Sequence, residues 1–173
     1  MLSKTASAGE NGQFRTPRHI IKMMVDMVEP KKDDTICDPS SGTAGFLVAS
    51  GEYLHENHKD WFSEKAFREH YNGKMFTGVE FDSTMIRIGA MNLQLHGITQ
   101  PHLVPKDALS ESNADMREQF SLILANPPFT GSLDYDAVES SVLKTVKTKK
   151  TELLFLGLML RMLKTGGRAA VIV

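Results

Sequence analysis

Short apolar runs alternate with segments of helical pattern along this chain, and no other feature narrows its possible folds as much. The runs lie at 35–37, 75–79, 102–104, 120–125 and 168–173. The intervening segments carry helix signals, such as the apolar face formed by Ile20, Met24 and Val28. Strands that alternate with helices predict a parallel sheet with helices on both faces, because each crossover returns the chain to the same edge.

Local signals place the ends of the first helix. Thr16 suits an N-cap and Pro17 the first helical position, and Pro30 stops the helix. Ser83 can cap a later helix that Gly97 closes. Further expectations are a helix to about 56 after the first strand, helices at 83–96 and 151–163, a helical surface insertion at 57–74, and a mobile loop at 130–150.

Length and composition fit one globular domain. The chain has 173 residues, and its net charge of −1 gives no global positive field that would draw it to nucleic acid. The single cysteine, Cys37, excludes an internal disulfide and a Cys-rich zinc site. No signal peptide or membrane-spanning stretch is visible, so a cytoplasmic location without a membrane partner is expected.

Polar residues follow four of the predicted strands: Asp38, Glu80, Asp107 and Asn126. In a parallel sheet such strand ends meet at one edge, where ligands bind. The loop after Asp38 is rich in small residues, so backbone N–H groups can face a ligand there. A carboxylate beside that loop disfavours phosphate. Glu80 suits ribose hydroxyls and Asp107 an adenine amino group. These features describe a nucleoside with a positive centre; S-adenosyl-L-methionine fits and NAD does not.

The most specific motif is Asn126-Pro127-Pro128-Phe129, directly after an apolar strand. Prolines have no N–H, so their carbonyls remain available as acceptors. The Asn126 side chain and the Pro127 carbonyl can together hold the two hydrogens of an amino group. The nitrogen lone pair then points at a methyl donor, and Phe129 can stack on an extruded base.

Two clusters of ionisable residues have more ordinary interpretations. His55 and His58 lack a third ligand nearby, so no metal site is expected. A basic run after the catalytic motif is interpreted as solvated and mobile, although its position leaves contact with DNA phosphate open. It comprises Lys144, Lys147, Lys149 and Lys150.

Together these motifs resemble an amino-methylating DNA methyltransferase, above all the modification subunit of type I restriction-modification systems. The matching stretches are Gly12 to Pro17, Asp38 to Phe46, Gly78 to Glu80, Asp107-Ala108 and Asn126 to Phe129. Ser40-Ser41 stands where relatives often have Ala followed by Cys or Ala. The resemblance implies catalytic roles for Asn126, Pro127, Pro128 and Phe129. It implies cofactor contacts by Gln13, Phe14, Arg15, Thr16, Pro17, Arg18, Asp38, Ser41, Gly42, Thr43, Ala44, Gly45, Phe46, Glu80, Phe81, Asp107 and Ala108.

The resemblance also implies a Rossmann-like class I fold that uses S-adenosyl-L-methionine. It implies N6 methylation of a flipped adenine in double-stranded DNA, with separate specificity and restriction subunits. A flexible lead-in is expected at 1–11 and the methyltransferase domain at 12–173. The chain is expected to be a fragment, cut after the fifth strand.

Other activities remain open. Enzymes that methylate protein glutamine, and some that act on RNA, use a similar Asn-Pro-Pro-aromatic turn, and a non-catalytic cofactor-binding module would also fit. A cytosine C5 enzyme would need a Pro-Cys nucleophile, and Cys37 follows Ile36 instead.

Overall fold

The protein forms a five-stranded, wholly parallel sheet in the order β3-β2-β1-β4-β5. The structure is a computed structural model and describes residues 15–110, 115–128, 138, 140–146, 148 and 150–173. Its strands are β1 Ile36–Asp38, β2 Phe76–Glu80, β3 His102–Pro105, β4 Phe120–Ala125 and β5 Leu163–Val171. Its helices are α1 Arg18–Val28, α2 Gly45–Asn57, η1 Lys59–Ser63 (a 3-10 helix), α3 Lys65–Gly73, α4 Ser83–Leu95, α5 Ser140–Thr145 and α6 Thr151–Met162.

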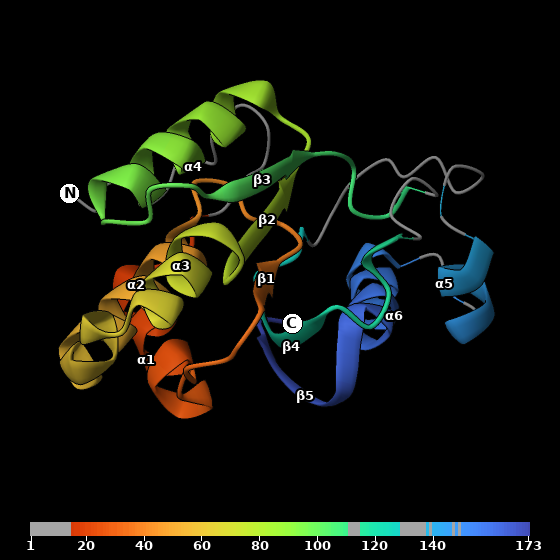
Figure 1. Cartoon of the computed structure of the whole chain (residues 1–173). Helices are drawn as coiled ribbons and strands as arrows, with labels where there is room; N and C mark the ends of the chain where they lie inside the picture. Colours follow the sequence, from red (N-terminus) through yellow and green to blue (C-terminus); the bar gives the residue numbers. More distant parts are fainter. Residues whose placement is uncertain (1–14, 111–114, 129–137, 139, 147, 149) are drawn as a thin grey trace, which may run out of the picture.

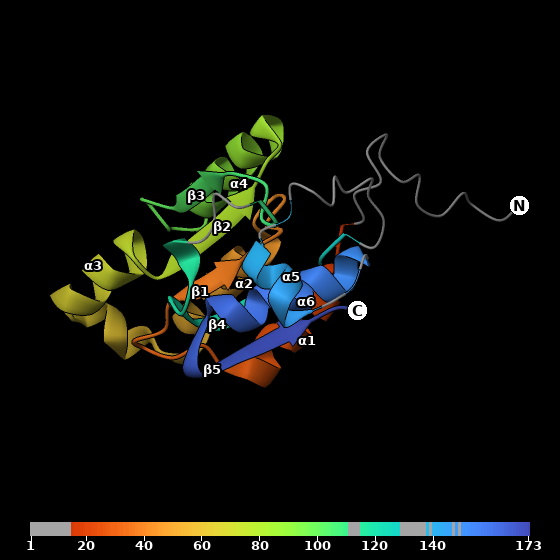
Figure 2. The same ribbon diagram turned by 90° about the vertical axis from the view of Figure 1, so that its right-hand side faces the viewer.

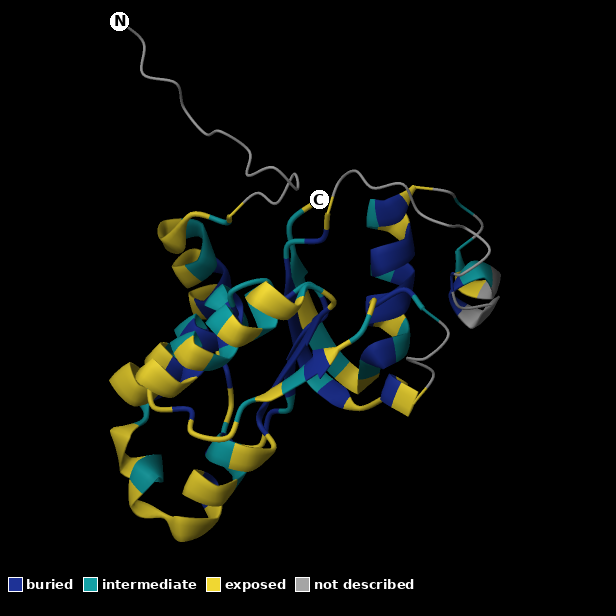
Figure 3. Ribbon diagram, turned by 90° about the horizontal axis from the view of Figure 1, so that it is seen from above, coloured by how far each residue is buried: buried dark blue, intermediate teal, exposed yellow. Residues whose placement is uncertain are grey.

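Helices cover both faces of the sheet, as the alternation of strands and helices predicts. Helices α1 to α4 lie on one side and α5 and α6 on the other (Figure 1; Figure 2 gives the orthogonal view). The central strands are buried on both faces, which explains why they read as continuous apolar runs. Alternate residues of a strand enter opposite cores: Ile36 packs in the core under α1 to α4, and Cys37 in the core under α6. Figure 3 shows how buried residues gather along the sheet and α6.

Several predicted boundaries need correction. The last helix ends at Met162, and β5 begins at Leu163, earlier than the apolar residues alone suggest. The predicted loop at 130–150 contains a helix, α5, although residues 129–137 lie outside the described part of the chain. Asp82, rather than Ser83, caps α4, because its carboxylate accepts hydrogen bonds from the backbone N–H groups of Thr84 and Met85. Gly97 follows this helix at φ +85°, in the left-handed conformation that ends helices.

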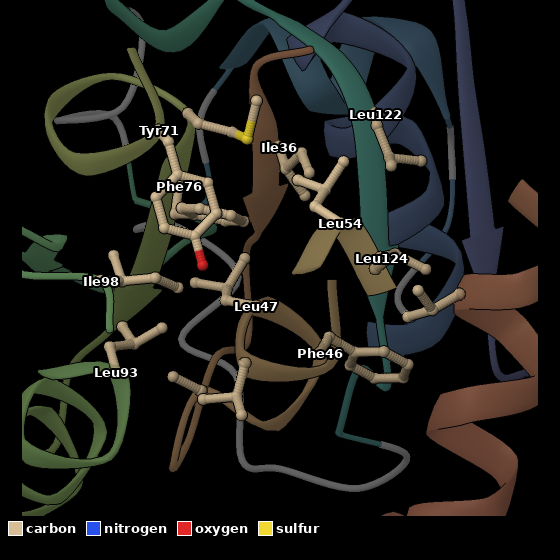
Figure 4. Packing of buried hydrophobic residues seen from close by; sticks show 14 of the residues in the cluster. Ile36, Phe46, Leu47, Leu54, Tyr71, Phe76, Leu93, Ile98, Leu122 and Leu124 are labelled. Atoms are coloured by element: carbon tan, nitrogen blue, oxygen red, sulfur yellow. The ribbon is translucent and has the colours of Figure 1, made fainter. Parts of the chain in front are cut away.

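The predicted surface insertion at 57–74 is partly core. Phe67 and Tyr71, one turn apart on α3, are 3% and 1% exposed and pack with Phe76 of β2. Figure 4 shows Tyr71 and Phe76 beside Leu47 and Ile98. The insertion is polar overall, but its aromatic residues share the face that turns toward the sheet.

The Tyr71 hydroxyl is buried and has no hydrogen-bond partner among the described residues. We therefore expect Tyr71→Phe to raise the free energy of unfolding by about 1 kcal/mol, because a desolvated and unpaired hydroxyl is removed while the ring packing stays. Urea unfolding of both proteins measures the change. A loss of stability above about 1 kcal/mol would show that the hydroxyl is hydrogen-bonded in solution, for instance to an internal water.

An ion pair fixes the C-terminal end of α1 to the amino edge of the sheet. Arg168 of β5 binds Asp34 through two nitrogen–oxygen contacts of 2.7 and 3.1 Å. The same guanidinium donates to the carbonyls of Val28 and Glu29 at 2.8 Å, which satisfies the open end of the helix. Asp34 is only 4% exposed and also accepts from the Ser121 hydroxyl at 2.7 Å. The buried Asp34 carboxylate is thus paired with Arg168 of β5 and hydrogen-bonded by Ser121 of β4.

Candidate active site

All four predicted polar strand ends lie at the carboxyl edge of the sheet, and three of them belong to strands at or next to its switch point. The chain proceeds from β1 outward to β2 and β3, and then returns to the other side of β1 to form β4. Asp38 ends β1, Glu80 ends β2, and Asn126 follows β4. A crevice between β1 and β4 is where open α/β sheets bind ligands. The fold therefore brings these three residues to one edge.

Glu80 holds the small-residue loop against the end of β2. Its Oε2 accepts a hydrogen bond from the Gly42 N–H at 3.0 Å, and its Oε1 accepts from the Phe81 and Asp82 N–H groups at 2.9 Å each. The Ser41 N–H donates to the Val79 carbonyl at 3.0 Å. The loop is consequently tied to β2 at Ser41 and Gly42.

The loop follows a strained path close to β2. Gly42 lies at φ +49° and Ala44 at φ +62°, and the left-handed conformation costs a non-glycine residue such as Ala44 about 1–2 kcal/mol. A side chain at Gly78 would meet Leu103 Cδ2 at 2.6 Å and Ser41 Oγ at 2.8 Å. This close approach requires glycine at position 78. Strain of this kind gathers at ligand-binding loops.

Asp38 is buried, 2% exposed, and accepts hydrogen bonds from the Ser40 N–H at 3.0 Å and hydroxyl at 3.4 Å. Burial raises the pKa of Asp38 to about 7; the Ser40 hydrogen bonds oppose this rise, and the negative charge of Glu80 adds to it. A cationic ligand group beside Asp38 would stabilise its charged form. Asp38 could therefore respond to a positively charged ligand group, which is the role that the sequence predicts for it.

The side-chain carboxamide of Asn126 is hydrogen-bonded through its nitrogen but not through its oxygen. Its Nδ2 donates to Thr16 Oγ1 at 2.9 Å, whereas its Oδ1 is buried and has no partner among the described residues. Pro127 is buried and Pro128 exposed, and Phe129 lies outside the described residues. A buried carbonyl acceptor thus lies unpaired directly after β4.

The expected N-cap role of Thr16 is wrong. Pro17 occupies the cap position, no side chain caps the helix, and α1 begins at Arg18. The Thr16 hydroxyl binds Asn126 instead, and the sequence gives no signal for this pairing across 110 positions. Arg15, Pro17 and Arg18 are exposed beside it. Gln13 and Phe14 lie outside the described residues.

The remaining predicted site residues differ in their accessibility. Phe81 is 74% exposed next to Glu80, whereas Ala44, Phe46 and Ala108 lie in the cores. Thr43 and Gly45 are half-buried, and the Thr43 carbonyl accepts from Asn92 Nδ2 at 2.9 Å. No local signal in the sequence marks this contact, because Asn92 looks like any other asparagine within a helix.

Asp107 lies at the same edge of the sheet, next to Lys106, whose backbone N–H donates to the Glu80 carbonyl at 3.1 Å. It is exposed and follows β3, and its Oδ1 accepts from the Leu109 N–H at 2.9 Å in a local turn. The side chain closes the turn that buries Ala108 and Leu109.

The described residues contain neither a metal-binding cluster nor a membrane-spanning helix. No group of three His, Cys, Asp or Glu side chains in that part of the chain is placed to hold a metal ion. His55 and His58 instead stack on Phe62 and Trp61, with ring centroids 3.9 and 3.8 Å apart. None of the described helices combines the length and apolarity that a bilayer crossing requires.

Comparison with known proteins shows the family to which the chain belongs. The family model described as N-6 DNA Methylase matches residues 1–173. The methylase subunit of the type I restriction enzyme EcoEI from Escherichia coli is 33% identical over 99% of this chain and 34% of its own length. The chain thus spans about a third of that curated relative.

Solved structures agree with the fold. A modification subunit of a putative type I restriction enzyme from Vibrio vulnificus YJ016 superposes with a TM-score of 0.76 at 31% identity, over 95% of this chain and 35% of that one. The M protein of the type I restriction enzyme EcoKI gives a TM-score of 0.79 at 26% identity, over 92% of this chain and 33% of that one. These matches confirm the predicted methyltransferase-type parallel sheet. The chain belongs to the N-6 DNA methylase family.

Proposed function

We propose that this chain transfers methyl groups from S-adenosyl-L-methionine to adenine N6 in DNA, as part of the modification subunit of a type I restriction-modification system. The observation that carries the proposal is Asn126 Oδ1, a buried acceptor without a partner at the carboxyl end of β4. Leaving such an atom unpaired costs about 1–3 kcal/mol. A substrate amino group would donate to it, and family membership supports an amino nitrogen as the methyl acceptor.

The residues at the carboxyl edge suit S-adenosyl-L-methionine, whose use the family and the fold imply. The exposed Phe81 ring beside the Glu80 carboxylate suits an adenine base with its ribose hydroxyls. The buried Asp38 carboxyl suits a positively charged ligand group, because a nearby cation lowers the raised pKa of that carboxyl. When bound, this cofactor supplies an electrophilic methyl group on a positively charged sulfur.

The work assigned to this chain is to hold and orient the amino group. Asn126 Oδ1 and the Pro127 carbonyl would accept its two hydrogens, which directs the nitrogen lone pair toward the methyl group. Phe129 would stack on the extruded adenine. The substrate nitrogen is itself the nucleophile: it would bond to the methyl carbon as the carbon–sulfur bond breaks, and it would then release one proton. No side chain of the protein has to attack the methyl group, so orientation in a partly buried site would supply the catalytic advantage.

We further propose double-stranded DNA as the substrate and specificity and restriction subunits as partners. The type I relatives named above support this assignment, since their names describe methylase or modification subunits. The chain has a net charge of −1, so it has no overall positive charge to bind DNA, and we expect partner subunits to supply most of the DNA contacts. Residues 12–173 are proposed as the cofactor-binding and catalytic domain.

Transfer of a labelled methyl group tests the function. The protein, purified with any subunits that accompany it, is incubated with labelled S-adenosyl-L-methionine and double-stranded DNA that contains or lacks adenine. RNA and a glutamine-containing protein serve as alternative acceptors. Label in N6-methyladenine is expected, and label confined to RNA or protein would refute the DNA assignment. Cofactor binding without any transfer would favour a non-catalytic module.

Replacing Glu80 by alanine is expected to weaken binding of S-adenosyl-L-methionine about 10- to 100-fold. The change removes the proposed ribose partner and the acceptor that orders Gly42, Phe81 and Asp82. Isothermal titration calorimetry measures the affinity. Glu64→Ala, which removes an exposed carboxylate paired with Lys32, is the matched control and should bind normally. If both variants bound S-adenosyl-L-methionine with equal affinity, Glu80 would not be a cofactor-binding residue.

A further inference from the structure

We propose that Thr16 is a positioning residue that holds the Asn126 carboxamide with its oxygen toward the substrate. This inference rests on the proposed function. It differs from the cofactor contact that the resemblance implies for Thr16. The proposal rests on the contact between Thr16, which precedes α1, and Asn126, which follows β4.

The contact divides the carboxamide into two ends with different roles. Thr16 Oγ1 lies 2.9 Å from Asn126 Nδ2, while Oδ1 is buried and without a partner among the described residues. Only the oxygen can accept hydrogens from an amino group. A carboxamide rotated by 180° would direct N–H groups at the substrate amino group and repel it. The productive orientation is therefore the one in which the nitrogen faces Thr16.

The backbone around Thr16 is stiff enough to act as a fixed support. A residue before proline is confined to extended conformations, and Thr has restricted rotation about χ1. The Pro17 carbonyl accepts hydrogen bonds from the N–H groups of Ile20 and Ile21 at 3.0 and 3.1 Å. Helix α1 is itself anchored, because its residues Met24 and Val25 are buried in the core. The Thr16 hydroxyl is thus held by a rigid element.

Asn126 needs such a support because its own position gives little restraint. It follows the last residue of β4, and no other side-chain hydrogen bond of Asn126 is present among the described residues. Loss of the Thr16 hydroxyl leaves both ends of the carboxamide unpaired and free to rotate. A misplacement of about 1 Å in a catalytic group can lower the rate about 100-fold.

The test compares three variants of the protein purified with its accompanying subunits. Thr16→Val removes the hydroxyl and keeps the shape, Thr16→Ser keeps the hydroxyl, and Thr99→Val removes a similar exposed contact of 2.8 Å to Asn72. We expect Thr16→Val to lower kcat about 10- to 100-fold without changing KM for S-adenosyl-L-methionine. Thr16→Ser should recover most of the rate, and Thr99→Val should match the parent protein. A raised cofactor KM with normal kcat would overturn the proposal in favour of a cofactor contact, as would a Ser variant as slow as the Val variant.

A second readout does not depend on turnover. In protein labelled with ¹⁵N-asparagine, the side-chain NH2 resonances of Asn126 should shift in Thr16→Val and stay unchanged in Thr99→Val. Unchanged Asn126 resonances in Thr16→Val would refute the contact. A parent protein that methylates no adenine would refute the proposed function, and the resonances would still decide whether Thr16 orients Asn126.

Discussion

Asn126→Ala is expected to lower methyl transfer at least about 100-fold while S-adenosyl-L-methionine binds as before. The substitution removes the buried Oδ1 acceptor that we assign to the substrate amino group. Removal of one preorganised hydrogen-bond partner from an active site typically lowers kcat about 100- to 1,000-fold. The side chain touches the end of β4 and Thr16, so the loop that Glu80 holds stays intact. Transfer of labelled methyl groups and calorimetric titration measure the two effects separately.

Asn57→Ala is the matched control for this substitution. Asn57 also donates through Nδ2, to the Tyr53 carbonyl at 2.9 Å, but it lies exposed at the end of α2. Its replacement should leave turnover and cofactor affinity unchanged. If Asn126→Ala lost cofactor affinity as well as activity, Asn126 would belong to the cofactor pocket and its catalytic role would have to be withdrawn.

Arg168→Met is expected to destabilise the fold by about 3 kcal/mol. Breaking one side of a buried ion pair costs about 3–5 kcal/mol, and partial exposure of Arg168 favours the lower end. Asp34 would keep a buried charge, and the carbonyls of Val28 and Glu29 would lose their donor. At this chain length the loss corresponds to a fall in Tm of about 6–12 °C. Lys164→Met, which removes an exposed cation from the same strand, should change stability by less than about 0.5 kcal/mol.

The ion pair also makes stability depend on pH. Burial alone raises the pKa of Asp34, but hydrogen bonds from Arg168, Ser121 and the Lys31 N–H outweigh it and hold the pKa below its usual value. Because the folded-state pKa is depressed, this stabilisation is complete above the unfolded pKa of about 3.9 and is lost as pH falls through the folded pKa. Urea unfolding between about pH 2 and 5 should show a weaker acid dependence in Arg168→Met. An unchanged dependence would mean that Arg168 does not control the Asp34 charge.

The sequence predicted the sheet and the edge that carries the site. Continuous apolar runs mark strands buried on both faces, and parallel strands bring Asp38, Glu80 and Asn126 to one edge by topology alone. These are properties of local pattern and chain direction. They can be read without any knowledge of which side chains touch.

The side-chain contacts could not be predicted from the sequence, because they join residues that lie far apart along the chain. A hydroxyl before a helix normally caps it, but Thr16 is captured by Asn126 from a distant strand. Arg168 and Asp34 pair across 134 positions, which no local rule detects. By contrast, the burial of Phe67 and Tyr71 was predictable, since aromatic residues four apart share one face of a helix.

The two anchors of α1 have a consequence for the order of folding. Helix α1 and Thr16 before it precede every strand of the sheet in the sequence, yet they contact Asn126, 110 positions from Thr16, and Arg168, 140 positions from Val28. Contacts across such separations form late, because closing a long loop costs entropy before the contact contributes. The small-residue loop after Asp38 is therefore synthesised long before Asn126 can be oriented. Under the proposed roles, the loop that binds the cofactor would be present early in synthesis. Asn126 could be oriented for catalysis only after β5 has joined the sheet.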